Sequence, residues 1–189
     1  MGSRTARGKR AVFRSAKELA CMALMTALLI AAQLALSMIA GVEIVTVLFL
    51  SYCVSFGIRR GMAVATAFSL LRCLLFGFAP NVVILYLVYY NFFAAVFGGA
   101  GKFFAESGEK KRLAAMTVLA VILSAAFTLI DDAITPLFFG YSPRAALGYF
   151  YASLPVMAVQ MLCSAVTVAL LFVPLSKAFS AVRGGLKQR

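Results

Sequence analysis

One arginine and three carboxylates are the residues of this sequence whose types and positions could do chemistry. Arg72 lies deep inside the apolar segment at residues 61–79, where an arginine in a membrane costs from about 3 kcal/mol upward. Glu43, Asp131 and Asp132 lie near the ends of other apolar segments. Two interpretations of Arg72 stay open: a salt bridge to a carboxylate on a neighbouring helix, or contact with a ligand. Consecutive helical residues diverge by about 100°, so we expect only one of the two aspartates to face the helix bundle.

Asparagine and tyrosine residues lie in the same or neighbouring apolar segments as these charged residues. Tyrosines near a membrane interface often form an aromatic belt, but apolar walls, aromatic faces and a few polar groups also make up small-molecule pockets. Glu43 could instead only complement the dipole of the segment that follows it. We predict a pocket that opens outward, with the substrate-binding residues Glu43, Arg72, Asn81, Tyr86, Asn91, Asp131 and Tyr149.

Several kinds of chemistry have no support in the residue types. The sequence has no histidine and four isolated cysteines, which argues against a zinc site, another metal site or a disulfide framework. The stretch Gly98-Gly99-Ala100-Gly101-Lys102 has the composition of a phosphate-binding loop. However, Val96 and Phe103 occupy the positions that need glycine and Ser or Thr. We interpret this stretch as a flexible exit from the fourth apolar segment, and we expect neither a cofactor nor catalysis.

Six apolar segments must position these residues. Hydrophobic residues make up 63% of the 189 positions and charged residues 13%, a composition typical of integral membrane proteins. Most segments approach the about 20 residues that cross a bilayer as a helix. We predict an all-α integral membrane protein, with a six-helix membrane domain at 19–175 between basic tails at 1–18 and 176–189. The spans lie at about 19–40, 44–58, 61–79, 82–100, 113–134 and 150–175. The longest connection, between Ala133 and Phe150, is too short for a soluble catalytic domain.

Lysine and arginine are confined to alternate connections. Of the 18 such residues, all except Arg72 and Arg144 lie in the two tails or in the second and fourth connections. Cytoplasmic loops retain positive charge, so both termini are predicted to be cytoplasmic. The segment at 44–58 is short, but Arg59 and Arg60 would lie outside if it did not cross, so we count it as a span. This orientation signal and the attraction of basic residues to anionic membrane lipid together explain the net charge of +12. No nucleic-acid partner is expected.

Alanines recur at four-residue spacing in the first apolar segment. Small residues at this spacing share one helix face and allow another helix to approach closely. Two interpretations are open: internal packing against a neighbouring span, or a docking surface for another protein. The candidate docking residues are Ala16, Ala20, Ala23, Ala27 and Ala31.

Over its whole length the chain resembles the substrate-binding (S) components of energy-coupling factor (ECF) transporters, which take up vitamins in bacteria and archaea. The resemblance rests on the six-span plan, the alanine-spaced first helix, and the order and spacing of short segments. These segments are Gly41-Val42-Glu43-Ile44-Val45-Thr46, Phe56-Gly57-Ile58-Arg59-Arg60, Leu74-Leu75-Phe76-Gly77-Phe78, Ala146-Leu147-Gly148-Tyr149-Phe150, Leu154-Pro155 and Phe172-Val173-Pro174-Leu175.

The resemblance implies a non-catalytic subunit in the plasma membrane of a prokaryote. Such a subunit captures a small water-soluble vitamin or related micronutrient outside the cell. It then docks through the alanine face on a transmembrane scaffold (T) subunit that carries two ATP-binding subunits. The implied pocket lies in the outer half of the membrane, beneath the external loops.

Two other functions remain alternatives. One is a small intramembrane enzyme that uses Asp131 or Asp132 together with Arg72, although no nucleophile lies beside a base in this sequence. The other is a structural or accessory membrane subunit without a ligand, in which Arg72 only pairs with a carboxylate.

Overall fold

The structure is a computed structural model, and it describes residues 16–39 and 42–187. These residues form six α-helices and no strand, which confirms the all-α prediction for this part of the chain. Residues 1–15 of the predicted N-terminal tail and residues 188–189 lie outside it. The helices are α1 (Ala16–Leu36), α2 (Val45–Phe56), α3 (Ile58–Phe76), α4 (Pro80–Phe103), α5 (Glu109–Phe138) and α6 (Pro143–Lys187).

Four helices, α1, α4, α5 and α6, are long and apolar enough to cross a membrane. Large apolar side chains also cover the outer surface of the bundle: Leu24, Leu74, Val88, Leu162 and Leu170 are each more than 60% exposed. Such a surface suits lipid and not water. The remaining two helices differ, because α2 has only 12 residues and α3 carries Arg59, Arg60 and Arg72. The chain is therefore suited to a membrane, while the count of six spans stays a prediction.

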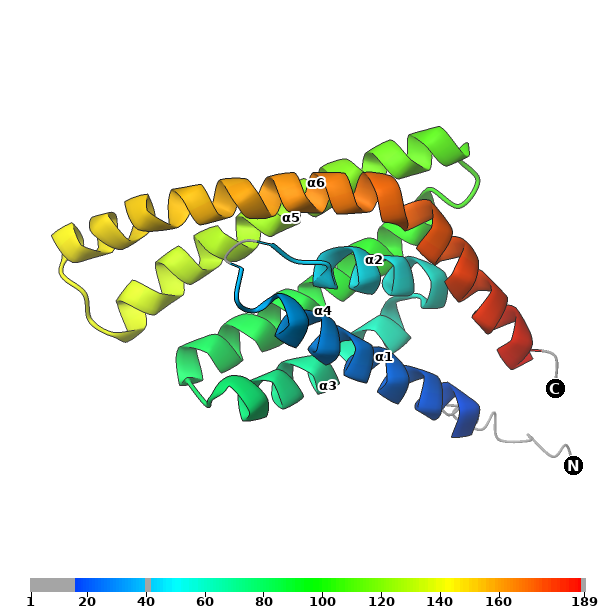
Figure 1. The fold of residues 1–189 in the computed structure, drawn as a ribbon, viewed down its shortest axis with the longest axis horizontal. Coiled ribbons are helices and arrows are strands. Elements are labelled where there is room, and N and C mark those ends of the chain that lie inside the picture. The colour runs from blue at the N-terminus through cyan, green and yellow to red at the C-terminus, as the bar shows by residue number, and fades with distance from the viewer. Residues whose placement is uncertain (1–15, 40–41, 188–189) are drawn as a thin grey trace, which may run out of the picture.

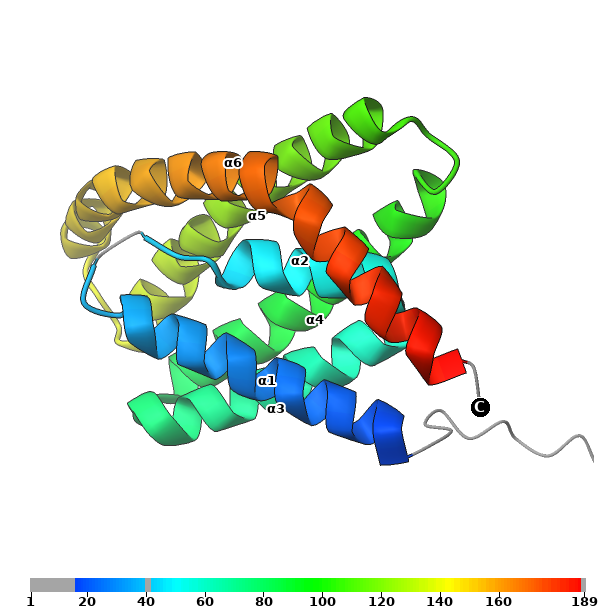
Figure 2. The ribbon, with the colours of Figure 1, turned by 45° about the vertical axis from the view of Figure 1, so that its right-hand side comes forward.

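Successive helices alternate in direction (Figure 1). The start of α1, the junction of α2 with α3, the α4–α5 connection and the end of α6 lie at one end of the molecule (Figures 1 and 2). Three of these places meet in one shallow cavity, which is lined by Arg59, Arg60, Lys102 and Arg183. The other three connections lie toward the opposite end. Basic side chains from separate connections are thus gathered at one end of the bundle.

Helix α2 forms the centre of the bundle. Every residue of α2 except Val54 is buried, and α2 contacts all five other helices. Phe49 stacks on Phe93 of α4 with ring centroids 5.4 Å apart, and Tyr52 stacks on Phe56 at 4.6 Å. A mostly apolar helix without a solvent-exposed face suits a buried position, and the polar side chains of Thr46, Ser51 and Ser55 are buried with the rest.

The glycine cluster at the end of the fourth segment is a packing surface. We expected a flexible exit there, but α4 continues as a helix through Phe103. A Cβ atom on Gly98 would lie 2.7 Å from the backbone nitrogen of Ile58, and one on Gly101 would lie 2.9 Å from the Cα of Val54. The glycines are needed because α4 passes directly against the backbone of the α2–α3 junction.

Helices α5 and α6 extend beyond the predicted spans. The connection between them is residues 139–142, much shorter than the connection we expected, because α5 passes Pro136 and α6 already begins at Pro143. Residues 176–187, which we placed in a C-terminal tail, continue α6 as a helix. Helix α6 bends in its C-terminal part (Figure 1), where Pro174 removes a backbone hydrogen bond.

Candidate functional site

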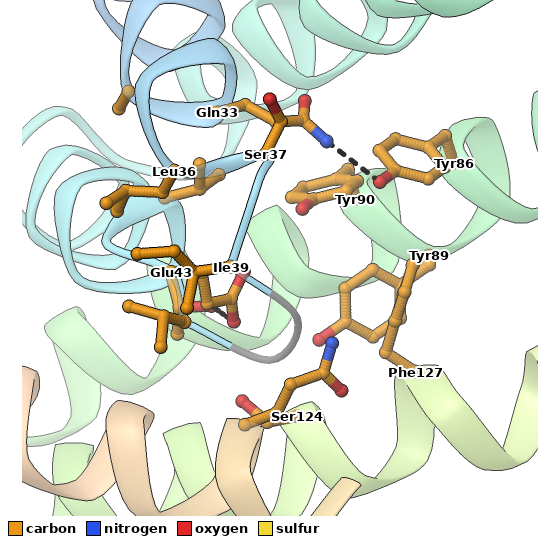
Figure 3. Close-up of a pocket in the computed structure, with 15 residues that line it drawn as sticks. Gln33, Leu36, Ser37, Ile39, Glu43, Tyr86, Tyr89, Tyr90, Ser124 and Phe127 are labelled. Atoms are coloured by element: carbon orange, nitrogen blue, oxygen red, sulfur yellow. Dashed lines mark hydrogen bonds between the residues drawn. The ribbon is translucent and has the colours of Figure 1, made fainter. Parts of the chain in front are cut away.

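A cavity of about 190 Å³ lies between α1, α2, α4, α5 and α6, next to the α1–α2 connection. We call it the main cavity (Figure 3). Its polar or aromatic lining residues are Gln33, Ser37, Glu43, Thr46, Tyr86, Tyr89, Tyr90, Ser124, Phe127 and Gln160. The apolar lining residues are Ala32, Leu36, Ile39, Val42 and Val45. Five helices therefore contribute to one chamber that combines aromatic faces with a few polar groups, as small-molecule sites do.

Helix α4 supplies the aromatic wall. Tyr86, Tyr89 and Tyr90 are spaced by three and four residues, which places them on one helix face, and all three are buried. The Tyr89 hydroxyl donates to the carbonyl of Leu123 at 2.9 Å. The ring of Phe127 on α5 meets Tyr89 edge-on, with centroids 4.8 Å apart. These contacts fix the orientation of the tyrosine rings in the cavity (Figure 3).

Glu43 brings a carboxylate into the main cavity from the α1–α2 connection. Thr46 donates a hydrogen bond to Glu43 Oε1 at 2.6 Å. The Glu43 backbone is held against α6, because its N–H donates to Cys163 Sγ at 3.4 Å and that thiol donates to the Glu43 carbonyl at 3.1 Å. Burial raises the pKa of Glu43 above its ordinary value, and the hydrogen bond from Thr46 lowers it by a smaller amount.

Gln33 on α1 lies across the cavity from Glu43. Its Nε2 donates to the Tyr86 hydroxyl at 3.1 Å (Figure 3). Its Oε1 is buried and has no hydrogen-bond partner among the described residues. Gln160 on α6 accepts a hydrogen bond from Thr128 at 2.8 Å. Polar side chains therefore line the cavity from α1, α5 and α6, in addition to the predicted Tyr86 of α4.

Arg72 lies behind the aromatic wall and does not line the main cavity. Its guanidinium stacks on the Tyr86 ring, with Cζ 4.2 Å from the centroid, and also lies 5.2 Å from the centroid of Phe76. In the described part of the chain no carboxylate oxygen lies within 4 Å of the Arg72 guanidinium. The ion pair found among the described residues joins Arg60 to Glu18 at 2.7 Å. The structure thus lacks the salt bridge that we considered, and Arg72 is linked to the main cavity by its contact with Tyr86.

Three other predicted residues form one hydrogen-bonded chain across α4, α5 and α6. Asn81 Nδ2 donates to Thr135 Oγ1 at 3.1 Å, and Thr135 donates to Asp131 Oδ1 at 2.8 Å. Tyr149 donates to Asp131 Oδ2 at 2.9 Å. Asp131 and Tyr149 also line a second cavity of about 300 Å³, which shares Phe127 and Gln160 with the main cavity. Asn81, Asp131 and Tyr149 are therefore neighbours of the main cavity but do not line it.

Both aspartates reach α6, which corrects the expectation that only one of them faces the bundle. Asp131 accepts from Tyr149, and Asp132 Oδ2 accepts from Ser153 at 2.7 Å. The reason is that α6 lies alongside α5 (Figure 1). Side chains on both edges of the α5 surface that faces α6 can therefore contact α6.

Asn91 joins α4 to α3 and lies away from both cavities. Its Nδ2 donates to Thr66 Oγ1 at 3.2 Å and to the Leu87 carbonyl at 2.8 Å. Of the seven predicted site residues, Glu43 and Tyr86 line the main cavity. Sequence reasoning missed Gln33 and Gln160, although a lone glutamine in an apolar segment was a usable signal.

The alanine-spaced face of α1 is exposed. Ala16, Ala20, Ala23, Ala27 and Ala31 are all exposed, together with Leu24 and Leu28. Helix α1 packs inward through Met22, Met25, Thr26, Leu29 and Ile30 instead. Internal packing, one of the two interpretations of the alanines, is therefore not seen.

Comparisons with protein-family models, curated proteins and solved structures return no match to this chain.

Proposed function

We propose that this chain is the membrane-embedded substrate-capture subunit of an ECF-type uptake transporter in a prokaryotic plasma membrane. The observation that carries the proposal is the main cavity, where a buried tyrosine wall, two glutamines and one carboxylate converge between five apolar helices. A chamber of this composition suits a small water-soluble vitamin or related micronutrient. The subunit binds and does not catalyse.

The proposed topology has six spans, with both termini in the cytoplasm. It is supported by the alternating helix directions (Figure 1) and by the gathering of Arg59, Arg60, Lys102 and Arg183 at one end of the bundle. Positive charge is retained on the cytoplasmic side. We count the short helix α2 as a span because α3 begins where α2 ends and runs back in the opposite direction.

In this proposal the exposed face of α1 docks on the T subunit, which carries two ATP-binding subunits. The support is the exposure of the five alanines from Ala16 to Ala31, because small side chains let a partner helix approach closely. The partner supplies the energy, and this chain supplies the ligand site.

Co-purification tests ligand capture. The protein is purified in detergent and denatured, and the released small molecules are identified by mass spectrometry. Ala32 lines the main cavity, so we expect Ala32→Leu to fill space and to abolish co-purification of the compound that the unmodified protein carries. Ala114→Leu is the control, because Ala114 is exposed on α5. A protein that carries no compound, and that no vitamin stabilises, would favour the accessory-subunit alternative.

A further inference from the structure

The charge inside the main cavity is one-sided. Of the 15 residues that line it, Glu43 is the only acidic one, and none is lysine or arginine. The guanidinium of Arg72 does not line the cavity and stacks on the ring of Tyr86. A carboxylate ligand would find no cationic side chain in this lining.

The lining also presents hydrogen-bond acceptors that need a donor. Glu43 Oε1 accepts from Thr46, and within the described residues no side chain donates to Oε2. The buried Gln33 Oε1 has no partner there either. A buried acceptor without a partner, such as Gln33 Oε1 in the described part of the chain, is costly. A ligand that brings N–H donors or a positive charge relieves this cost.

The tyrosine faces fit the same kind of ligand. Tyr86 and Tyr90 have centroids 5.2 Å apart and planes inclined by 34°, whereas Tyr89 and Tyr90 are perpendicular at 5.3 Å. The three rings therefore line one chamber in different planes. Organic cations bind over tyrosine faces within about 6 Å of the centroid, and the attraction increases when water is excluded.

We propose that the main cavity recognises an organic cation, a protonated amine or a quaternary ammonium group, with Glu43 as its counter-charge and the α4 tyrosines as its walls. The proposal rests on the proposed capture function and narrows its substrate class. It excludes carboxylates and other anions of similar size. Cys163 is a positioning residue, because it holds the backbone of Glu43 on α6.

Isosteric probes test the charge requirement. One probe pair is choline and its neutral isostere 3,3-dimethylbutan-1-ol. The second set is the cation benzylamine, the neutral benzyl alcohol and the anion benzoate. Each compound is titrated into the detergent-purified protein, and binding is measured by calorimetry and thermal shift. We expect the two cations to bind and the neutral and anionic partners to bind at least about 10-fold more weakly. We expect Glu43→Gln to weaken cation binding by about 100-fold. Glu106→Gln is the matched control, because Glu106 is exposed outside the cavity and its loss should change nothing.

The pH dependence supplies a second readout. The titratable groups facing Glu43 are Tyr86, Tyr89 and Tyr90 of α4 and Cys163 of α6, while α1 presents Gln33 and α5 presents Ser124. A cation requires the ionised carboxylate, so its affinity should fall as pH drops through the raised pKa of Glu43, and Glu43→Gln should remove this dependence. Tighter binding at low pH would overturn the assignment.

The outcomes separate the two proposals. Preferential binding of benzoate or of the neutral isosteres, or cation binding that is unchanged by Glu43→Gln, would overturn the cation assignment and leave ligand capture intact. No binding by any probe and no co-purifying compound would contradict capture itself, and the cation assignment with it.

Discussion

Arg72 acts on the cavity through a ring. Its guanidinium is planar and stacks on Tyr86, whose hydroxyl accepts a hydrogen bond from Gln33. The sequence identified Arg72 as an unusual membrane charge, but its partner depends on how α3 and α4 are aligned, which no local pattern records. A stacked guanidinium cannot be exchanged for an ammonium without loss.

We predict that Arg72→Lys lowers the free energy of unfolding by about 1 kcal/mol, because the ammonium keeps the charge but loses the planar stacking on Tyr86. Choline affinity should fall by less than about 10-fold, with its selectivity over 3,3-dimethylbutan-1-ol retained. Thermal unfolding and calorimetry measure the two effects. Arg59→Lys is the control, since Arg59 is exposed. A complete loss of selectivity would mean that Arg72 faces the ligand.

Thr135 is the central link between Asn81 and Asp131. Thr135→Val keeps the shape but leaves a buried amide and a carboxylate without their partner, so we expect a loss of about 1–3 kcal/mol of stability. Thr117→Val is the comparison, because within the described residues the Thr117 hydroxyl donates only to the Leu113 carbonyl of its own helix. Equal stability of the two variants would show that the chain of hydrogen bonds contributes nothing.

At the level of elements, the existence of the helices was predictable, because long apolar segments leave few alternatives in a membrane. Their ends were not. Pro174 and Lys177 look like the end of a span, yet α6 continues through both to Lys187. The glycine stretch looked like an exit, because a sequence does not reveal which backbone lies 2.7 Å from a missing Cβ atom.

Two neighbouring glycines of α4 provide a matched pair of variants that tests the helix contact. Gly98→Ala places a Cβ against the Ile58 backbone, and we expect destabilisation of about 1–3 kcal/mol from overpacking. A Cβ on the neighbouring Gly99 meets nothing within 4 Å, so Gly99→Ala should be neutral or should stabilise the helix by up to about 1 kcal/mol. Thermal unfolding in detergent measures both variants. Equal melting temperatures would contradict the close approach of α4 to the α2–α3 junction.

For the whole molecule, the site could be predicted only in part. The sequence identified Glu43 and Tyr86, but it also included Asn91, which packs against α3. A cavity made from five helices depends on their mutual positions, and these arise from packing between residues far apart in the chain. The charge pattern predicts which ends of the helices share a side, and this can be measured.

Cysteine labelling measures the topology. In a variant without the four native cysteines, Ser37→Cys in the α1–α2 connection and Ser142→Cys in the α5–α6 connection should react with an impermeant maleimide on intact cells. Arg59→Cys and Ser107→Cys should react only after the membrane is opened. All four positions lie at or near helix ends. Reaction of Ser37→Cys and Arg59→Cys from the same side would show that α2 does not cross the membrane.

The enclosure of α2 also constrains how this protein is made. Helix α2 leaves the ribosome before α3 to α6, but it has only 12 residues, about 18 Å of helix, which is too short to cross the hydrocarbon on its own. Its buried Ser51, Tyr52 and Ser55 belong to a helix that packs mainly against α4 and α6, which are synthesised later. If the chain is inserted into a membrane during synthesis, we therefore expect α2 to reach its buried position only after α4 and α6 have been made.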